Sequence, residues 1–120
     1  MISVLISAGS RYPFDRKTIR KKAKDFLRQA GLREVEVSLS IVGTRKSLFL
    51  NKQYRQLDQP ASVLAFGLDD PRGPDGVLRL GDVVVCYPIA RQQAVQQRKM
   101  MDDVLWELVE HGIKNLIKMT

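Results

Sequence analysis

The 120 residues amount to 13.6 kDa, the usual size of one domain, and we expect residues 1–120 to fold as a single unit. Hydrophobic residues make up 44% and charged residues 28%, which is typical of a globular chain and excludes a disordered or fibrous one. A lone cysteine excludes an internal disulfide, and with one histidine it excludes a Cys/His zinc finger, so a reducing cytoplasm is the expected location. No apolar run approaches the roughly 18 residues of a membrane helix, so we expect no membrane partner.

Positive charge is concentrated in the first half of the chain. The net charge is +7 and the isoelectric point is about 9.9, a range typical of nucleic-acid-binding proteins. Residues 1–60 contain 13 basic and 5 acidic side chains, whereas residues 61–120 contain 7 and 8. The first half therefore carries +8 and the second half −1.

The first element is a predicted strand over residues 2–7, and a strongly basic helix follows it. Asp15 is the expected N-cap of this helix and Gly31 its C-terminal stop. Its apolar stripe, at helical spacing, consists of Ile19, Ala23, Phe26, Leu27 and Ala30. The cationic residues are Arg16, Lys17, Arg20, Lys21, Lys22, Lys24 and Arg28. Such a face attracts polyanions such as RNA, and the alternative is a solvated face that only keeps the protein soluble.

A second strand and a second helix come next. Apolar and polar residues alternate over residues 35–41, which predicts a half-buried strand that pairs with the first one. Thr44 is the expected cap of a short helix. The residues on one face of that helix are Ser47, Leu48, Asn51 and Tyr54.

The second half of the chain predicts three short strands followed by two helices. The strands cover residues 63–66, 77–80 and 83–86, with a bend or bulge at Gly81 and the last strand buried on both faces. Pro88 is expected to open one helix, and the other is expected to start near Asp102 or Asp103. Its inward residues are predicted to be Leu105, Leu108, Val109, Gly112 and Leu116. The order of elements predicts an α+β domain with a small mixed four-stranded sheet and four to five helices.

Residues 50–66, LNKQYRQLDQPASVLAF, resemble the pattern LNxxYRxxDxPTDVLSF of the YbeY family. Nine pattern positions match: Leu50, Asn51, Tyr54, Arg55, Asp58, Pro60, Val63, Leu64 and Phe66. Three positions differ: Ala61, Ser62 and Ala65. Residues 80–85, LGDVVV, are similar to the family's LGDIVI strand. The resemblance implies an rRNA maturation factor of the ribosome whose family activity is zinc-dependent hydrolysis of single-stranded RNA.

The family's histidine signature, HGxLHLxGYDH, is only partly present. In the family its three histidines hold a zinc ion with one position open to water. Here His111 matches the first histidine, Asn115 stands at the second position, and the third position lies one residue past Thr120. An amide oxygen is a poor zinc ligand, so we expect zinc to be absent or weakly bound and the nuclease activity weakened or lost. The alternatives are rescue of the metal by Glu107, Asp82 or Cys86, and a histidine with no metal role that lines a groove.

Arg55 is the other candidate for the reaction. The resemblance makes it a cation near the metal, and a guanidinium is suited to a phosphate because it donates two parallel hydrogen bonds. The alternatives for Arg55 are an ion pair with Asp58 or hydrogen bonds to backbone carbonyls. Asn51 and Asp58 are expected to brace the turn into the next strand. Tyr54, Leu48, Val63 and Phe66 are interpreted as core rather than as residues that stack on RNA.

The candidate catalytic residues are therefore Arg55 and His111, and the candidate RNA-binding residues are Arg55, Lys17, Lys21, Lys24 and Arg28. The expected partners are rRNA or other single-stranded RNA and a ribosomal subunit or ribosomal protein. The alternative function is a scaffold that binds RNA or the ribosome without catalysis. The sequence leaves the oligomeric state open.

Overall fold

A computed structural model describes residues 1–120 and contains one four-stranded mixed sheet with four helices. The elements in chain order are β1 (Ile2–Ala8), α1 (Arg16–Gln29), β2 (Val35–Val42), α2 (Thr44–Arg55), β3 (Val63–Phe66), β4 (Leu78–Cys86), α3 (Tyr87–Gln97) and α4 (Met101–Met119). This confirms the predicted α+β class and the size of the sheet, with four helices. None of the helices has the length and apolar character needed to cross a membrane.

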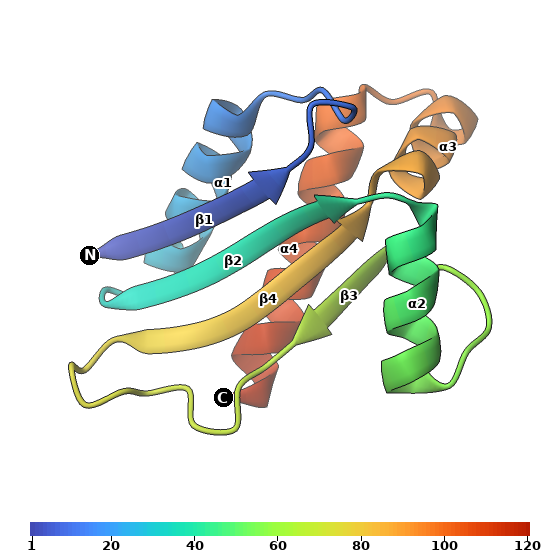
Figure 1. Ribbon diagram of the computed structural model, residues 1–120. Coiled ribbons are helices and arrows are strands. Elements are labelled where there is room, and N and C mark those ends of the chain that lie inside the picture. The colour runs from blue at the N-terminus through green and yellow to red at the C-terminus, as the bar shows by residue number, and fades with distance from the viewer.

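The strand order is β1-β2-β4-β3, so β1 and β3 form opposite edges of the sheet. β1 and β4 both run parallel to β2, whereas β3 runs antiparallel to β4. The predicted pairing of the first two strands is therefore confirmed. α1 and α4 cover one face of the sheet, while α2 and α3 stand near the end where β2 and β4 stop (Figure 1).

The core lies between the sheet and the helices α1 and α4. The alternation predicted for β2 is confirmed, because Val35, Val37, Leu39 and Ile41 are buried. In α1 the buried residues are Ile19, Ala23 and Leu27, whereas Ala30 is exposed because it lies at the C-cap. Asp15 caps α1 as predicted, since its carboxylate accepts a hydrogen bond from the Thr18 backbone N–H at 3.2 Å.

β4 corrects the prediction of two separate strands over residues 77–86. It is one strand, and the register against β2 shifts so that Leu80 has no partner, which is the bulge expected beside Gly81. A Cβ on Gly81 would lie 2.0 Å from the Phe66 carbonyl oxygen, and its φ of +123° is open only to glycine. The extra residue keeps apolar side chains facing the helices on both sides of the bulge: Leu78 and Leu80 before it, Val83 and Val85 after it.

Three helix starts differ slightly from the predictions. Gly43, and not Thr44, is the N-cap of α2, and it has no side chain to offer a capping bond. α3 begins at Tyr87, one residue before Pro88, and α4 begins at Met101, just before the two aspartates. These shifts leave the predicted inward residues of α4 in place, with Leu108 half-buried and the others buried.

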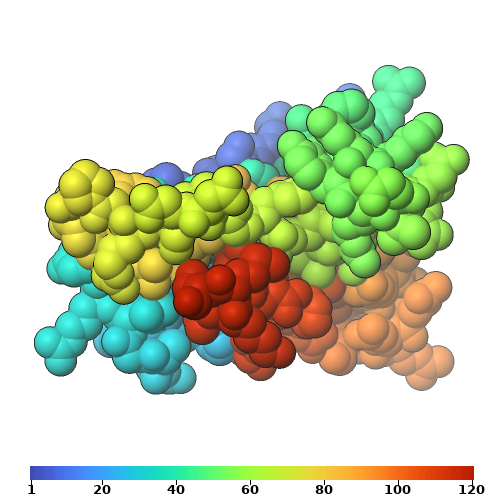
Figure 2. All heavy atoms as spheres, turned by 90° about the horizontal axis from the view of Figure 1, so that it is seen from below, coloured from blue at the N-terminus to red at the C-terminus, as the bar shows by residue number.

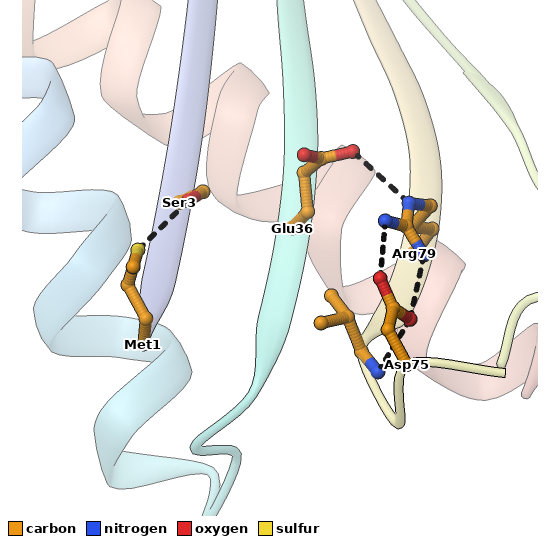
Figure 3. Close-up of polar contacts among 6 residues, drawn as sticks. Met1, Ser3, Glu36, Asp75 and Arg79 are labelled. Atoms are coloured by element: carbon orange, nitrogen blue, oxygen red, sulfur yellow. Dashed lines mark hydrogen bonds and ion pairs between the residues drawn. The ribbon is translucent and has the colours of Figure 1, made fainter. Parts of the chain in front are cut away.

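The loop between β3 and β4 is anchored to the sheet by an ion-pair network. The Arg79 guanidinium lies between Asp75, at 2.9 Å from Nη2 to Oδ2, and Glu36, at 3.7 Å from Nε to Oε2 (Figure 3). Asp75 also accepts a hydrogen bond from the Val77 backbone N–H at 3.1 Å. This pairing fixes where the loop joins β4.

Candidate active-site groove

A groove of about 980 Å³ lies along the free edge of the sheet. β3 forms its wall, because all four of its residues line the groove. α2 and α4 contribute the other sides, and Ser40, Asp82 and Val84 of the neighbouring strands complete it. In Figure 2 this edge faces the reader, with β3 between α2 in green and the end of α4 in red.

Arg55 enters the groove from the last turn of α2. Its side chain is exposed and takes part in no ion pair or side-chain hydrogen bond. Asp58 lies nearer to Lys52, at 3.9 Å, so the expected pairing of Arg55 with Asp58 is not formed. Arg55 also donates no side-chain hydrogen bond to a backbone carbonyl. Its guanidinium is therefore available for an anion.

His111 and Asn115 enter the groove from the opposite side, one turn apart on α4. Gly112 of the same helix is buried against the sheet and brings α4 close to β4. The structure therefore brings the two candidate catalytic residues, Arg55 and His111, into one groove. An imidazole supplies a group that can exchange a proton, and the amide can donate and accept hydrogen bonds.

The residues of the groove do not fit the zinc site that the resemblance implied. A structural or catalytic zinc needs at least three protein ligands, and no three His, Cys, Asp or Glu residues in 1–120 lie close enough together to hold a metal ion. Of the three substitutes proposed for the missing histidines, Asp82 lines the groove together with His111, but no third ligand joins them. Glu107 is engaged by Lys99 at 2.7 Å, and the Cys86 thiol is buried.

The basic helix α1 lies away from the groove. It packs on β1, at the edge of the sheet opposite β3 (Figure 1). Lys21 and Arg28 both lie near Asp25, at 3.9 and 3.0 Å, whereas Lys17 and Lys24 form no ion pair. The predicted RNA-binding residues therefore occupy two surfaces, with Arg55 on one and the four α1 residues on the other.

α2 is held in place by two buried polar side chains, one of which sequence reasoning left without a role. The Ser47 hydroxyl donates to the Ala61 carbonyl at 2.8 Å and accepts from the Ala61 N–H at 2.9 Å. The Asn51 amide donates to the Gln59 carbonyl at 2.7 Å, which confirms that Asn51 braces the turn before β3. Asp58, in contrast, is largely exposed, and its one ion pair is with Lys52.

Tyr54 corrects its assignment to the core. Its side chain is 58% exposed and lines the groove beside Arg55. Leu48, Val63 and Phe66 are half-buried, so they fit the core interpretation better. The ring of Tyr54 contacts the ring of Phe66, but this contact leaves more than half of the residue exposed.

Known proteins with similar sequences point to one family. The family profile described as Endoribonuclease YbeY matches residues 7–117. A protein named Endoribonuclease YbeY from Acinetobacter baumannii is 34% identical over 97% of this chain and 78% of its own length. One of the same name from Bordetella pertussis is 41% identical over 69% of this chain and 51% of its own length.

A solution structure of a Thermotoga maritima protein superposes with a TM-score of 0.61 at 25% sequence identity. It covers 97% of this chain and 71% of the Thermotoga chain. The sequence matches and the shared fold agree with the element order and with the motif over residues 50–66. The chain belongs to the YbeY family of endoribonucleases.

Proposed function

We propose that this protein binds single-stranded RNA, in particular rRNA during maturation, in the groove between α2 and α4. The observation that carries the proposal is Arg55, an unpaired guanidinium that shares the groove with His111. A guanidinium can donate two hydrogen bonds to one phosphate, and the proton-exchanging group opposite suits phosphodiester chemistry. Asp82 is the only carboxylate among the residues that line the groove.

We also propose that the family's zinc-dependent hydrolysis is weakened or lost in this chain. Asn115 stands one turn after His111, at the position where the family pattern has its second histidine. With an amide at this second position, the ligand set around His111 is incomplete and holds zinc weakly or not at all. Arg55 and His111 then act on RNA by binding and positioning it, and a non-catalytic RNA-binding or ribosome-binding scaffold is the limiting case.

The α1 residues Lys17, Lys21, Lys24 and Arg28 are proposed as a second, sequence-independent contact for a long RNA. Phosphate contacts of this kind position a nucleic acid without reading its bases. A ribosomal particle, which presents rRNA over a wide surface, can meet the groove and α1 together. We therefore propose a ribosomal subunit as the partner and the cytoplasm as the location.

RNA binding is tested by the affinity for a short single-stranded RNA and its salt dependence. Arg55→Ala should weaken binding and lower the slope of log K against log salt by about 0.7, the contribution of one phosphate contact on a single strand. Arg45→Ala is the matched control, because Arg45 is an exposed arginine at the other end of α2 that does not line the groove. An equal loss of RNA affinity in both variants would contradict a specific role for Arg55.

The state of the metal is tested by elemental analysis of untagged protein. We expect less than one zinc per chain. Asn115→His places two imidazoles four residues apart on one helix face, and this variant should bind zinc more tightly than the parent. One tightly held zinc per chain in the parent, with RNA cleavage that a chelator and His111→Ala both abolish, would overturn the proposed loss of activity.

A further inference from the structure

Tyr54 is an aromatic side chain that lies open in a polar groove. The residue is 58% exposed, and its ring contacts that of Phe66 in β3, with ring centroids 5.0 Å apart and ring planes tilted by 59°. The contact with Phe66 limits how the tyrosine ring can turn. Much of the ring nevertheless remains free to meet a ligand.

Tyr54 and its neighbour together offer one group suited to a nucleobase and one suited to a phosphate, the two parts of a nucleotide. The flat ring suits a nucleobase, and the adjacent residue, Arg55, offers a guanidinium to a phosphate in the same groove. Both residues sit in the last turn of α2, which Ser47 and Asn51 fasten to residues 59–61. The ring and the guanidinium therefore project from a helix whose position is fixed before a ligand arrives.

We propose that Tyr54 is the stacking platform for one unpaired nucleobase, with Arg55 on the phosphate of the same strand. This inference rests on the proposed function and names the residue that recognises the base. Stacking on a side chain requires a base that has left its neighbours, so the platform selects unpaired nucleotides over a duplex. Because every base has a π face, Tyr54 should distinguish single strands from duplexes without preferring any base sequence.

Phe49 provides a matched control on the same helix. It is similarly exposed, at 57%, but it does not line the groove, and the Lys46 ammonium lies 5.9 Å from its ring centroid. If any exposed aromatic on α2 could bind RNA by nonspecific contact, Phe49 and Tyr54 would behave alike. The proposal requires that they differ.

The test compares a short single-stranded oligoribonucleotide with the same backbone carrying abasic sites at its central positions. Wild-type protein should bind the complete strand about 5- to 150-fold more tightly, the range that one aromatic–base stack supports. Tyr54→Leu should bring this ratio close to one, whereas Tyr54→Phe and Phe49→Leu should preserve it. Arg55→Ala should weaken both oligonucleotides equally and leave the ratio unchanged.

The outcomes separate this inference from the proposed function. If the wild-type protein binds neither oligonucleotide, the proposed RNA binding itself fails. If it binds both with equal affinity, or if Tyr54→Leu keeps the ratio, RNA binding stands and the stacking role of Tyr54 is wrong. A fluorescent 2-aminopurine at the central position supplies a second readout, since its emission should fall on binding to the wild type and to Tyr54→Phe but not to Tyr54→Leu.

Discussion

At Gly112, α4 packs closely against β4. A Cβ added there would lie 2.5 Å from Val83 Cγ1 and 3.0 Å from Cγ2, and the Val83 side chain is fully buried. The glycine that follows His111 thus has a packing reason of its own. It sets how near His111 and Asn115 stand to β4.

Gly112→Ala should destabilise the protein. Alanine favours the helix by about 1 kcal/mol, but overpacking against a buried valine costs about 1–3 kcal/mol, so a net loss is expected. Urea unfolding checks it, with Gly9→Ala as the control because a Cβ on Gly9 meets nothing within 4 Å. In a Val83→Ala background, where the clashing methyl groups are gone, the same substitution should cost less, and an unchanged cost would contradict the packing explanation.

The ion pair between Asp75 and Arg79 should make the stability of the fold depend on pH. The hydrogen bonds from the Arg79 guanidinium lower the pKa of the Asp75 carboxyl from its ordinary 3.8 to about 2. A carboxyl whose pKa is lowered in the folded state stabilises the fold above its unfolded pKa, and the contribution is lost as pH falls through the folded value. Wild type should therefore be more stable than Asp75→Asn at pH 6, and the difference should shrink between pH 4 and 2.

The same comparison in high salt separates this ion pair from a structural effect of the substitution. Both partners are partly exposed, so salt should screen their attraction and reduce the difference at pH 6. A difference that is independent of both pH and salt would mean that the Asp75 charge does not stabilise the loop.

At the scale of elements, the position of α2 depends on Ser47. Ser47→Ala removes the donor to the Ala61 carbonyl and the acceptor for the Ala61 N–H, in a buried setting. Leaving such groups unpaired costs roughly 1–3 kcal/mol, which should appear as a lower thermal midpoint. Ser10→Ala, at an exposed turn, is the control and should change stability little. Equal midpoints for the two variants would contradict the bracing role.

Local patterns predicted the elements well where one physical signal dominated. α1 has a helical stripe with a cap at each end, and β2 has a strict alternation, so both were predictable from a few neighbouring residues. β4 was divided wrongly because Gly81 interrupts its pattern, although a bulge lets the strand continue through it. The cap of α2 was misplaced because Gly43 offers no side chain to mark it.

The site was less predictable because its geometry is not local. The motif over residues 50–66 identified Arg55, and the family pattern identified His111, but only the strand order places α2 and α4 on either side of β3. Helical spacing did not reveal the exposure of Tyr54. It shows which residues share a face of the helix but not which other elements pack against that face. Ser47 gave no signal beyond a polar residue at a buried helical position.

At the scale of the whole molecule, positive charge is divided between two edges of the sheet. Three interstrand spacings separate β1 from β3, about 14 Å, which exceeds the screening length of about 8 Å at physiological salt. The α1 cations therefore influence the groove little through space. They contribute when one RNA is long enough to contact both edges.

The triple charge reversal Lys17→Glu, Lys21→Glu and Lys24→Glu should weaken binding of a long single-stranded RNA and lower its salt slope by up to about 2. For an oligonucleotide short enough to lie within the groove, the affinity should change little. The corresponding triple lysine-to-arginine variant keeps the charge and should bind both RNAs like wild type. Equal losses for long and short RNA would contradict two separate surfaces.

The place of α4 in the chain has a consequence for synthesis. α4 follows every other element of this domain in chain order, yet it supplies buried side chains to the middle of the core: Val104, Leu105, Val109, Ile113 and Leu116. Until residues 101–119 emerge, the apolar side of β2 and β4 has no cover, and β4 itself must wait for residue 86 to complete its pairing with a strand made about forty residues earlier. The nascent protein therefore closes its core only after residues 101–119 have left the ribosome, and a chain stalled before α4 exposes the apolar face of the sheet to chaperones and proteases.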